Sequence, residues 1–175
     1  MKKSLLRWQI VGFVFASIAG VLLHFAFDLT DKNAFFALFS AVNESIWEHL
    51  KLLFFPMFVF ALIESRYIGG ENKSFWCVKL IGIMSGMALT VVLYYTINGV
   101  FGKTPDWINI AIFFIATAFS YILENRLLIK NSIECKSPMV PLTILVLIGV
   151  VFAVLTFITP QIPLFEDPIT KTYGY

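Results

Sequence analysis

The sequence predicts an all-α fold, a polytopic membrane helix bundle formed by a single domain over residues 1–175. Hydrophobic residues make up 59% of the chain and charged residues only 14%, whereas soluble proteins average about 25% charged residues. A soluble domain of this size has too little interior to bury so much apolar surface. Five apolar runs also approach the roughly 20 residues that a helix needs to cross a bilayer.

The five runs follow one another along the chain, with a short apolar segment between the first two. The second run reaches spanning length only if its helix begins inside NESIWEHLK, at residues 43–51. The segment AFFALFSAV, at residues 34–42, is too short to cross. We expect it to be re-entrant or interfacial, or an early turn of the second span. The expected spans are residues 8–27, 50–63, 75–100, 107–123 and 139–159.

Lysine and arginine predict the orientation, because they are enriched in cytoplasmic segments of membrane proteins. With the N-terminus inside, nine of the 13 Lys and Arg residues fall inside and four outside. The run at residues 8–27 is expected to be an uncleaved first span, since VLLHFAF continues it past a signal-peptide-like site. Cys77 and Cys135 then both face the cytoplasm, where we expect no structural disulfide.

Small residues predict where helices approach one another closely. Gly12, Ala16 and Gly20 share one face of the first span, and Gly82 and Gly86 form a GxxxG pair in the third. With four other helices to pack against, contacts within one chain are favoured over a dimer seam.

The densest polar cluster, NESIWEHLK, lies at the expected outer surface. In a helix that begins at Asn43, Glu44 and Glu48 share a stripe. His24 and Asp28 share a face in the last turns of the first span, and the connection to Asn43 is short, so the two helix ends should meet. The cluster comprises His24, Asp28, Asn43, Glu44, Ser45, Trp47, Glu48, His49 and Lys51.

Each of these residues also has an ordinary structural explanation. Ser45 and Glu48 fit a capping box, and Trp47 and Lys51 are typical interfacial anchors. Capping needs only one or two polar residues, however, and ionisable groups at membrane depth are costly. The combination therefore favours a functional cluster.

Imidazole and carboxylate groups together suit zinc or another divalent first-row metal. We expect His24, His49, Glu44 and Glu48 to converge in one solvent-reachable pocket at the outer leaflet. Three of them would bind the metal, and one carboxylate would act as general base. The catalytic candidates are Glu44, Glu48 and His49. The metalloprotease signature HExxH is absent.

Three functions stay open. The first is a metal-dependent, membrane-embedded hydrolase or transferase that acts on a lipid or small substrate. The second is a small ion or solute transporter that uses the same side chains, although five spans do not divide into two related halves. The third is a non-catalytic accessory protein. The net charge of +2 argues against a nucleic-acid partner, and the sequence decides neither enzyme activity nor oligomeric state.

Prolines indicate two further features. Pro56 removes a backbone donor inside the second span, so a kink is expected near Leu52. Three prolines prevent a helix in residues 160–175, yet this tail is apolar and aromatic. We expect it to fold over the outer face as a cap, with Glu166 and Asp167 near the polar cluster.

The segments LLHFAFDLT, LFSAVNESIWEHLKLLFFP, FWCVKL and IPLFEDPITKTYGY together resemble an uncharacterised family of small bacterial integral membrane proteins, a domain of unknown function. The resemblance covers the whole chain, and the N-E-S-x-W-E-H-x-K stretch carries it most specifically. It implies a place in the bacterial cytoplasmic membrane and gives weight to residues 43–51. It implies no activity.

Overall fold

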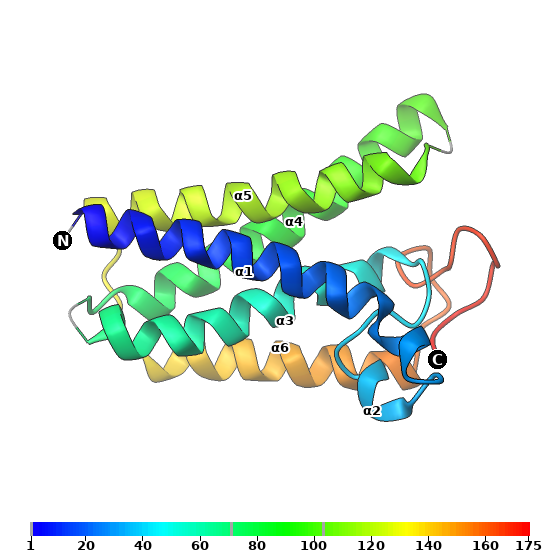
Figure 1. Cartoon of the computed structure of the whole chain (residues 1–175), viewed down its shortest axis with the longest axis horizontal. Coiled ribbons are helices and arrows are strands. Elements are labelled where there is room, and N and C mark those ends of the chain that lie inside the picture. Colours follow the sequence, from blue (N-terminus) through cyan, green and yellow to red (C-terminus); the bar gives the residue numbers. More distant parts are fainter. Residues whose placement is uncertain (1, 71, 103) are drawn as a thin grey trace.

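The computed structural model describes residues 2–70, 72–102 and 104–175 and shows a bundle of helices (Figure 1). Five of these helices are long and apolar enough to cross a membrane, as predicted. The N-terminus and the α5–α6 connection lie at one end of the bundle, and α2 and the C-terminal tail lie at the other (Figure 1). The elements are α1 (Lys2–Leu29), α2 (Ala34–Ala37), α3 (Ile46–Glu64), the π-helical turn η1 (Ser65–Gly69), α4 (Phe75–Phe101), α5 (Asp106–Lys130) and α6 (Met139–Phe157).

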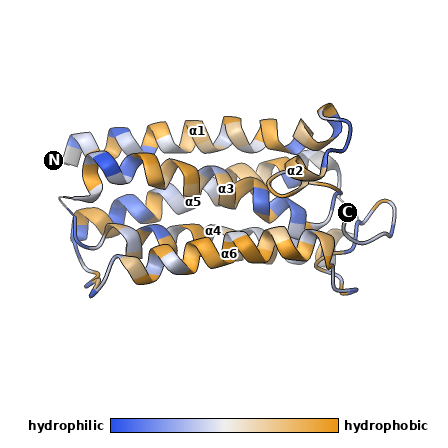
Figure 2. Cartoon of the chain, turned by 90° about the horizontal axis from the view of Figure 1, so that it is seen from below, coloured by the Kyte–Doolittle hydropathy of each residue, from blue (hydrophilic) through white to orange (hydrophobic). Residues whose placement is uncertain are grey.

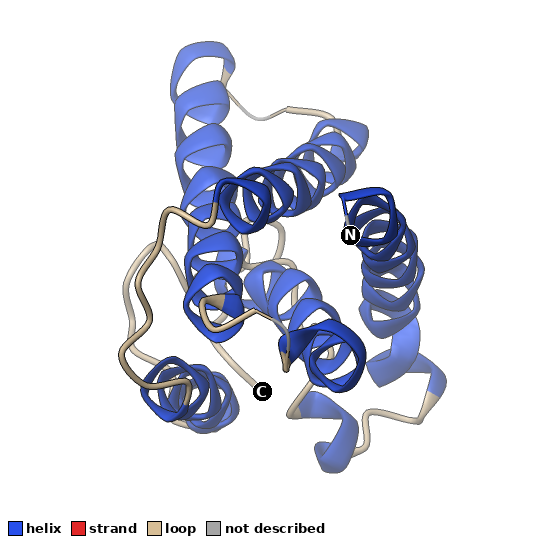
Figure 3. Ribbon diagram, turned by 90° about the vertical axis from the view of Figure 1, so that its left-hand side faces the viewer, coloured by secondary structure: helices blue, strands red, loops and turns tan. Residues whose placement is uncertain are grey.

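Helix α3 is the most enclosed of the long helices, because it packs against α1, α4 and α6. Its side chains Leu53, Phe54, Met57 and Phe60 are almost fully buried in the shared core. The helices surround this core when the bundle is seen end on (Figure 3). Large apolar side chains of α1, α5 and α6 point outward and stay exposed. Hydrophobic residues dominate the middle of the helices (Figure 2), as expected for a surface in contact with lipid.

The short segment after α1 folds back onto the bundle. Asn33 caps α2 by accepting a hydrogen bond from the backbone N–H of Phe35. Ala37 is fully buried, and the ring of Phe39 packs edge-on against Phe55 of α3. The segment is thus a separate short helix beside α3, and α3 itself begins at Ile46, inside the polar stretch as predicted.

The small residues of α1 face other helices, as predicted. Ala16 is 1% exposed. A Cβ atom added at Gly12 would lie 2.5 Å from the ring of Tyr121, and one at Gly20 would lie 2.7 Å from the carbonyl oxygen of Leu52. Pro56 has no N–H to donate to that carbonyl, so Gly20 meets α3 where its hydrogen-bond ladder is interrupted.

Gly82 and Gly86 of α4 give room to polar side chains of α5. A Cβ at Gly82 would lie 2.4 Å from Glu124, and one at Gly86 would lie 2.0 Å from the hydroxyl of Ser120. The GxxxG pair is therefore used inside the chain, as the sequence favoured.

A buried ion cluster joins four helices near the N-terminal end. Lys79 of α4 lies 2.5 Å from a carboxylate oxygen of Glu64 on α3 and 2.6 Å from one of Glu124 on α5. Gln9 of α1 donates a hydrogen bond of 2.7 Å to Glu64. All four side chains are nearly or fully buried. Because ions are costly in an apolar interior, this cluster fixes how the four helices fit together.

Cys77 and Cys135 form a disulfide, with their Cα atoms 5.9 Å apart. The prediction that this pair forms no structural disulfide is therefore wrong for the structure. The prediction relied on the redox state of the expected compartment, which says nothing about distance. The first turn of α4 and the α5–α6 connection meet at the same end of the bundle and bring the two thiols together.

Candidate functional site

The polar stretch at residues 43–51 divides into two groups of side chains. Ser45 is the N-cap of α3, and its hydroxyl accepts the N–H of Glu48. Glu44 therefore precedes the helix, and the stripe predicted for Glu44 and Glu48 does not form. Glu44 turns toward α1 and α5, whereas Glu48 turns into the core beside α6.

The first group consists of His24, Glu44 and His49. The Nε2 atom of His24 lies 3.8 Å from one oxygen of Glu44, and Nε2 of His49 lies 3.4 Å from the other. The imidazole rings are 5.5 Å apart. One potential ligand atom from each of the three residues lies within 4.8 Å of the other two. The predicted meeting of the α1 and α3 ends thus places both histidines around one carboxylate.

The orientation of His49 is fixed by a hydrogen bond to the backbone. Its Nδ1 atom lies 2.9 Å from the carbonyl oxygen of Ser45, and a carbonyl can only accept a hydrogen bond. Nδ1 therefore carries a proton, which leaves Nε2 as the nitrogen that faces Glu44 and that a metal could bind. Histidine ligands of metal ions commonly have this arrangement. Nδ1 of His24 is buried without a hydrogen-bond partner in the described chain, so no contact of this kind fixes its tautomer.

A cavity of about 380 Å³ opens beside these three residues. Asn109 of α5 faces it, and its side-chain oxygen is buried without a hydrogen-bond partner among the described residues. Sequence reasoning missed Asn109, although a lone amide inside an apolar span is a recognisable signal. The lining consists of Gly20, Val21, His24, Phe25, Glu44, His49, Leu52, Asn109, Ile110, Phe113 and Ile169.

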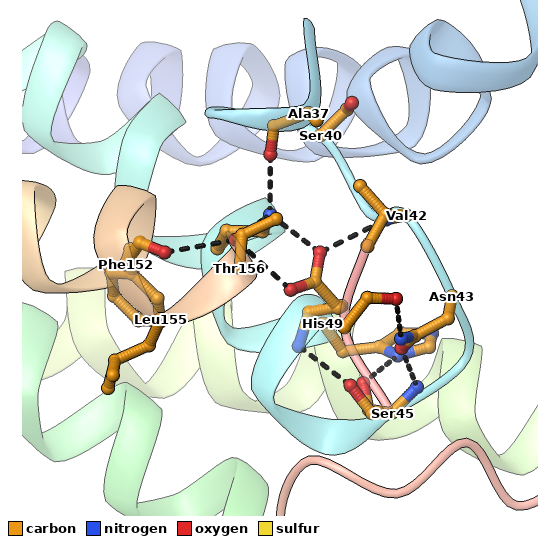
Figure 4. A network of polar contacts seen from close by, with 12 residues as sticks. Ala37, Ser40, Val42, Asn43, Ser45, His49, Phe152, Leu155 and Thr156 are labelled. Carbon is orange, nitrogen blue, oxygen red and sulfur yellow. Dashed lines mark hydrogen bonds and ion pairs between the residues drawn. The ribbon is translucent and has the colours of Figure 1, made fainter. Parts of the chain in front are cut away.

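The second group is built around Glu48 and Lys51, both nearly or fully buried. Their charged atoms are 2.6 Å apart. Lys51 also donates to the carbonyl of Ala37 and to the hydroxyl of Thr156, at 2.8 and 2.9 Å (Figure 4). All three ammonium protons are thus used. Glu48 in turn accepts the N–H of Val42 at 3.0 Å.

The predicted convergence of Glu48 with the histidines is therefore wrong. Glu48 is not among the residues that line the cavity beside the histidines, and its charge is already neutralised by Lys51. This pair instead fastens the segment after α2 and helix α6 to the start of α3. Among the candidate metal ligands, the structure groups His24, Glu44 and His49, and it gives Glu48 a structural position.

The remaining candidates lie around the site without lining the cavity. Asn43 donates to the carbonyl of Gly174 at 3.1 Å and accepts the N–H of Ser45 at 2.9 Å. Trp47 packs between Phe152 and Phe165, with ring centroids 4.6 Å apart in each case. Asp28 is exposed. The hydroxyl of Ser45 caps α3, and His49 is paired with the backbone carbonyl of Ser45.

The C-terminal tail covers this end of the bundle, as predicted. Asp167 accepts the backbone N–H of Glu44 at 3.2 Å and those of Ile169 and Thr170 at 2.7 and 3.0 Å. Burial raises the pKa of Asp167, whereas these hydrogen bonds together lower it by more. The pKa of Asp167 therefore lies below its ordinary value of 3.8. The stabilisation is therefore present above that value and is lost as the pH falls through the folded-state pKa.

The model of a family of unknown function, DUF6512, matches residues 1–175 of this chain. No curated protein and no solved structure gives a significant match. The geometry of the described residues therefore carries the functional argument.

Proposed function

This chain belongs to the family of unknown function DUF6512, and from its geometry we propose that it binds a divalent metal such as zinc at His24, Glu44 and His49. We propose further that the metal serves a membrane-embedded hydrolase or transferase. The observation that carries the proposal is the convergence of three ligand atoms within 4.8 Å of one another, beside a cavity that leaves room for substrate.

The distances suit zinc with little adjustment. Tetrahedral zinc with bonds of about 2.0–2.1 Å places its ligand atoms roughly 3.3 Å apart. The 3.4 Å between one oxygen of Glu44 and His49 already meets this spacing. The 3.8 Å between the other oxygen and His24 is somewhat longer, and a set of three ligand atoms within 4.8 Å closes around the metal by a movement of these side chains. These side chains are 23% to 43% exposed, so neighbouring atoms leave them room to move.

Three protein ligands are typical of catalytic zinc, because they leave a fourth position for water or substrate. A bound metal would lower the pKa of its water and polarise a substrate oxygen. Glu48 is held by Lys51, so it is not placed to act as the general base. Asn109 lines the cavity, and its buried side-chain oxygen has no hydrogen-bond partner in the described chain, so a turn of this amide would let it orient a substrate donor.

Zinc titration of metal-stripped protein tests the proposal. We expect one tightly bound zinc per chain, and we expect replacement of both histidines by alanine (His24→Ala with His49→Ala) to abolish it without unfolding the bundle. Magnesium should not compete, since it prefers oxygen ligands. A wild-type protein that binds no zinc, or a double variant that still binds it, would refute the metal site.

Asp167→Asn should weaken zinc binding about 10–100-fold, as is usual for a residue that orients a metal ligand. The new amide group would present N–H donors where the carboxylate now accepts three backbone N–H groups. Glu166→Gln is the matched control, because Glu166 pairs with exposed Lys171 and has no hydrogen bond to Glu44 in the described chain. Equal effects of the two substitutions would contradict a positioning role for Asp167.

For localisation, we propose the bacterial cytoplasmic membrane with the N-terminus inside, on the basis of the nine-to-four distribution of Lys and Arg. A reporter that is active only in the cytoplasm should therefore be inactive when it is fused after Tyr175. Strong activity of that fusion would reverse the orientation.

A further inference from the structure

The cavity beside the candidate metal site has a polar end and a larger apolar part. Its polar groups are His24, Glu44, His49 and Asn109. The rest of its lining is glycine and hydrophobic side chains from α1, α3, α5 and the tail. A fully polar solute would leave the apolar part of the lining without a matching surface. An amphiphile has both a polar and an apolar part and therefore matches the whole lining.

The apolar part reaches the outer surface of the bundle between α1 and α5. Val21 and Phe25 of α1 are 42% and 54% exposed, and Ile110 of α5 is 56% exposed, although all three line the cavity. Val21 lies one turn before His24, about 4.5 Å along the helix. Helices α1 and α5 run side by side and diverge toward the end that carries the site (Figure 1).

The chain itself bounds two other sides of the cavity. On the inner side, Gly20 lets α1 approach so closely that an added Cβ would lie 2.6 Å from Phe113 and 2.7 Å from the carbonyl oxygen of Leu52. At the end of the bundle, Ile169 of the tail adds to the wall, and Asp167 holds that part of the tail in place. The exposure of Val21, Phe25 and Ile110 therefore places one opening of the cavity where a spanning bundle meets lipid.

The charge of the metal site and the volume of the cavity limit further which molecules can bind there. A divalent metal bound to two neutral histidines and one carboxylate retains a net charge of +1, which favours an anionic group. A volume of about 380 Å³ lies near the lower end of the roughly 300–1,000 Å³ of small-molecule sites. It holds a small headgroup and the first carbons of a chain, and the remaining chain would stay in the bilayer.

We propose that the substrate is an anionic lipid with a small headgroup, which enters sideways from the bilayer between α1 and α5. This inference rests on the proposed metal site. The headgroup lies against the metal and Asn109, and the acyl chain lies along Val21, Phe25 and Ile110.

The test measures binding of dioleoyl phosphatidic acid to delipidated, zinc-loaded protein by native mass spectrometry. We expect one lipid per chain, and binding at least about 10-fold weaker for soluble glycerol phosphate or for zwitterionic dioleoyl phosphatidylcholine. Val21→Trp should fill the opening and weaken lipid binding at least about 10-fold. Leu22→Trp is the matched control, because Leu22 is 65% exposed on the same helix and is not part of the lining.

Zinc stoichiometry and thermal unfolding are measured on the same samples, so that a metal defect or misfolding is separated from a lipid defect. One zinc without lipid binding overturns the inference and leaves the proposed function standing. The same holds if glycerol phosphate binds as tightly as the lipid, or if the two tryptophan variants behave alike. A protein without zinc overturns both proposals.

Discussion

Glu44→Gln is expected to weaken zinc binding by more than about 100-fold while the bundle stays folded. Removing a residue that merely orients a ligand usually costs about 10–100-fold, and Glu44 is the carboxylate that both histidines face. Its side chain is 43% exposed, and apart from these two pairings it makes no hydrogen bond in the described chain. A neutral amide of the same shape therefore removes the ligand and little else. Isothermal titration with zinc and thermal unfolding give the two readouts.

Glu48→Gln is the matched control, four residues away with the same chemical change. It should leave zinc affinity within a few-fold of wild type, because Glu48 faces Lys51 and Thr156. It should instead lower the free energy of unfolding by about 3–5 kcal/mol, since it leaves a buried ammonium without its counter-charge. Adding Lys51→Met should recover much of that loss. A Glu48→Gln protein that loses zinc and keeps its stability would reinstate Glu48 as a ligand.

The different positions of these two glutamates show how far the sequence could predict the site. The apolar run LLFFPMFVFALI is too short to span a bilayer unless its helix begins in the polar stretch. Helix α3 does begin there, at Ile46, as predicted. The i,i+4 rule applies only when both residues are helical. Ser45 took the capping position, so Glu44 fell outside the helix. A shift of the helix start by two or three residues was enough to separate the two carboxylates.

Contacts between distant helices were harder to predict. The structure brings Lys79 of α4 to both Glu64 of α3 and Glu124 of α5. Pattern and spacing describe one helix at a time, whereas such a contact depends on the rotation of three helices about their axes. The same limit explains why the position of Asn109 at the cavity and the proximity of Cys77 and Cys135 were not predicted.

Lys79→Met is expected to destabilise the protein by about 3–5 kcal/mol, the usual cost of removing one partner from a buried ion pair. Lys79 is 1% exposed, and it separates Glu64 and Glu124, which are both fully buried. Its loss leaves two carboxylates in the interior without the cation that faces them. The ammonium of Lys79 lies 5.4 Å from the ring centroids of both Phe75 and Tyr121, and methionine, with a similar length, places an apolar group against the same rings. The loss in free energy of unfolding should therefore come from the missing positive charge and not from a change in side-chain volume.

Unfolding in mixed micelles measures this effect, with Lys130→Met as the control at an exposed position of α5, where a change within about 0.5 kcal/mol is expected. A triple variant that combines Lys79→Met with Glu64→Gln and Glu124→Gln tests whether unpaired charge causes the loss of stability. Once both carboxylates are neutral, most of the lost stability should return, because amides can be buried with hydrogen bonds at a lower cost than ions. Zinc binding should be unchanged in every variant, since the cluster and the metal site lie near opposite ends of the bundle (Figure 1). A Lys79→Met protein as stable as wild type, or a triple variant less stable than Lys79→Met alone, would show that the cluster does not hold the helices together by charge.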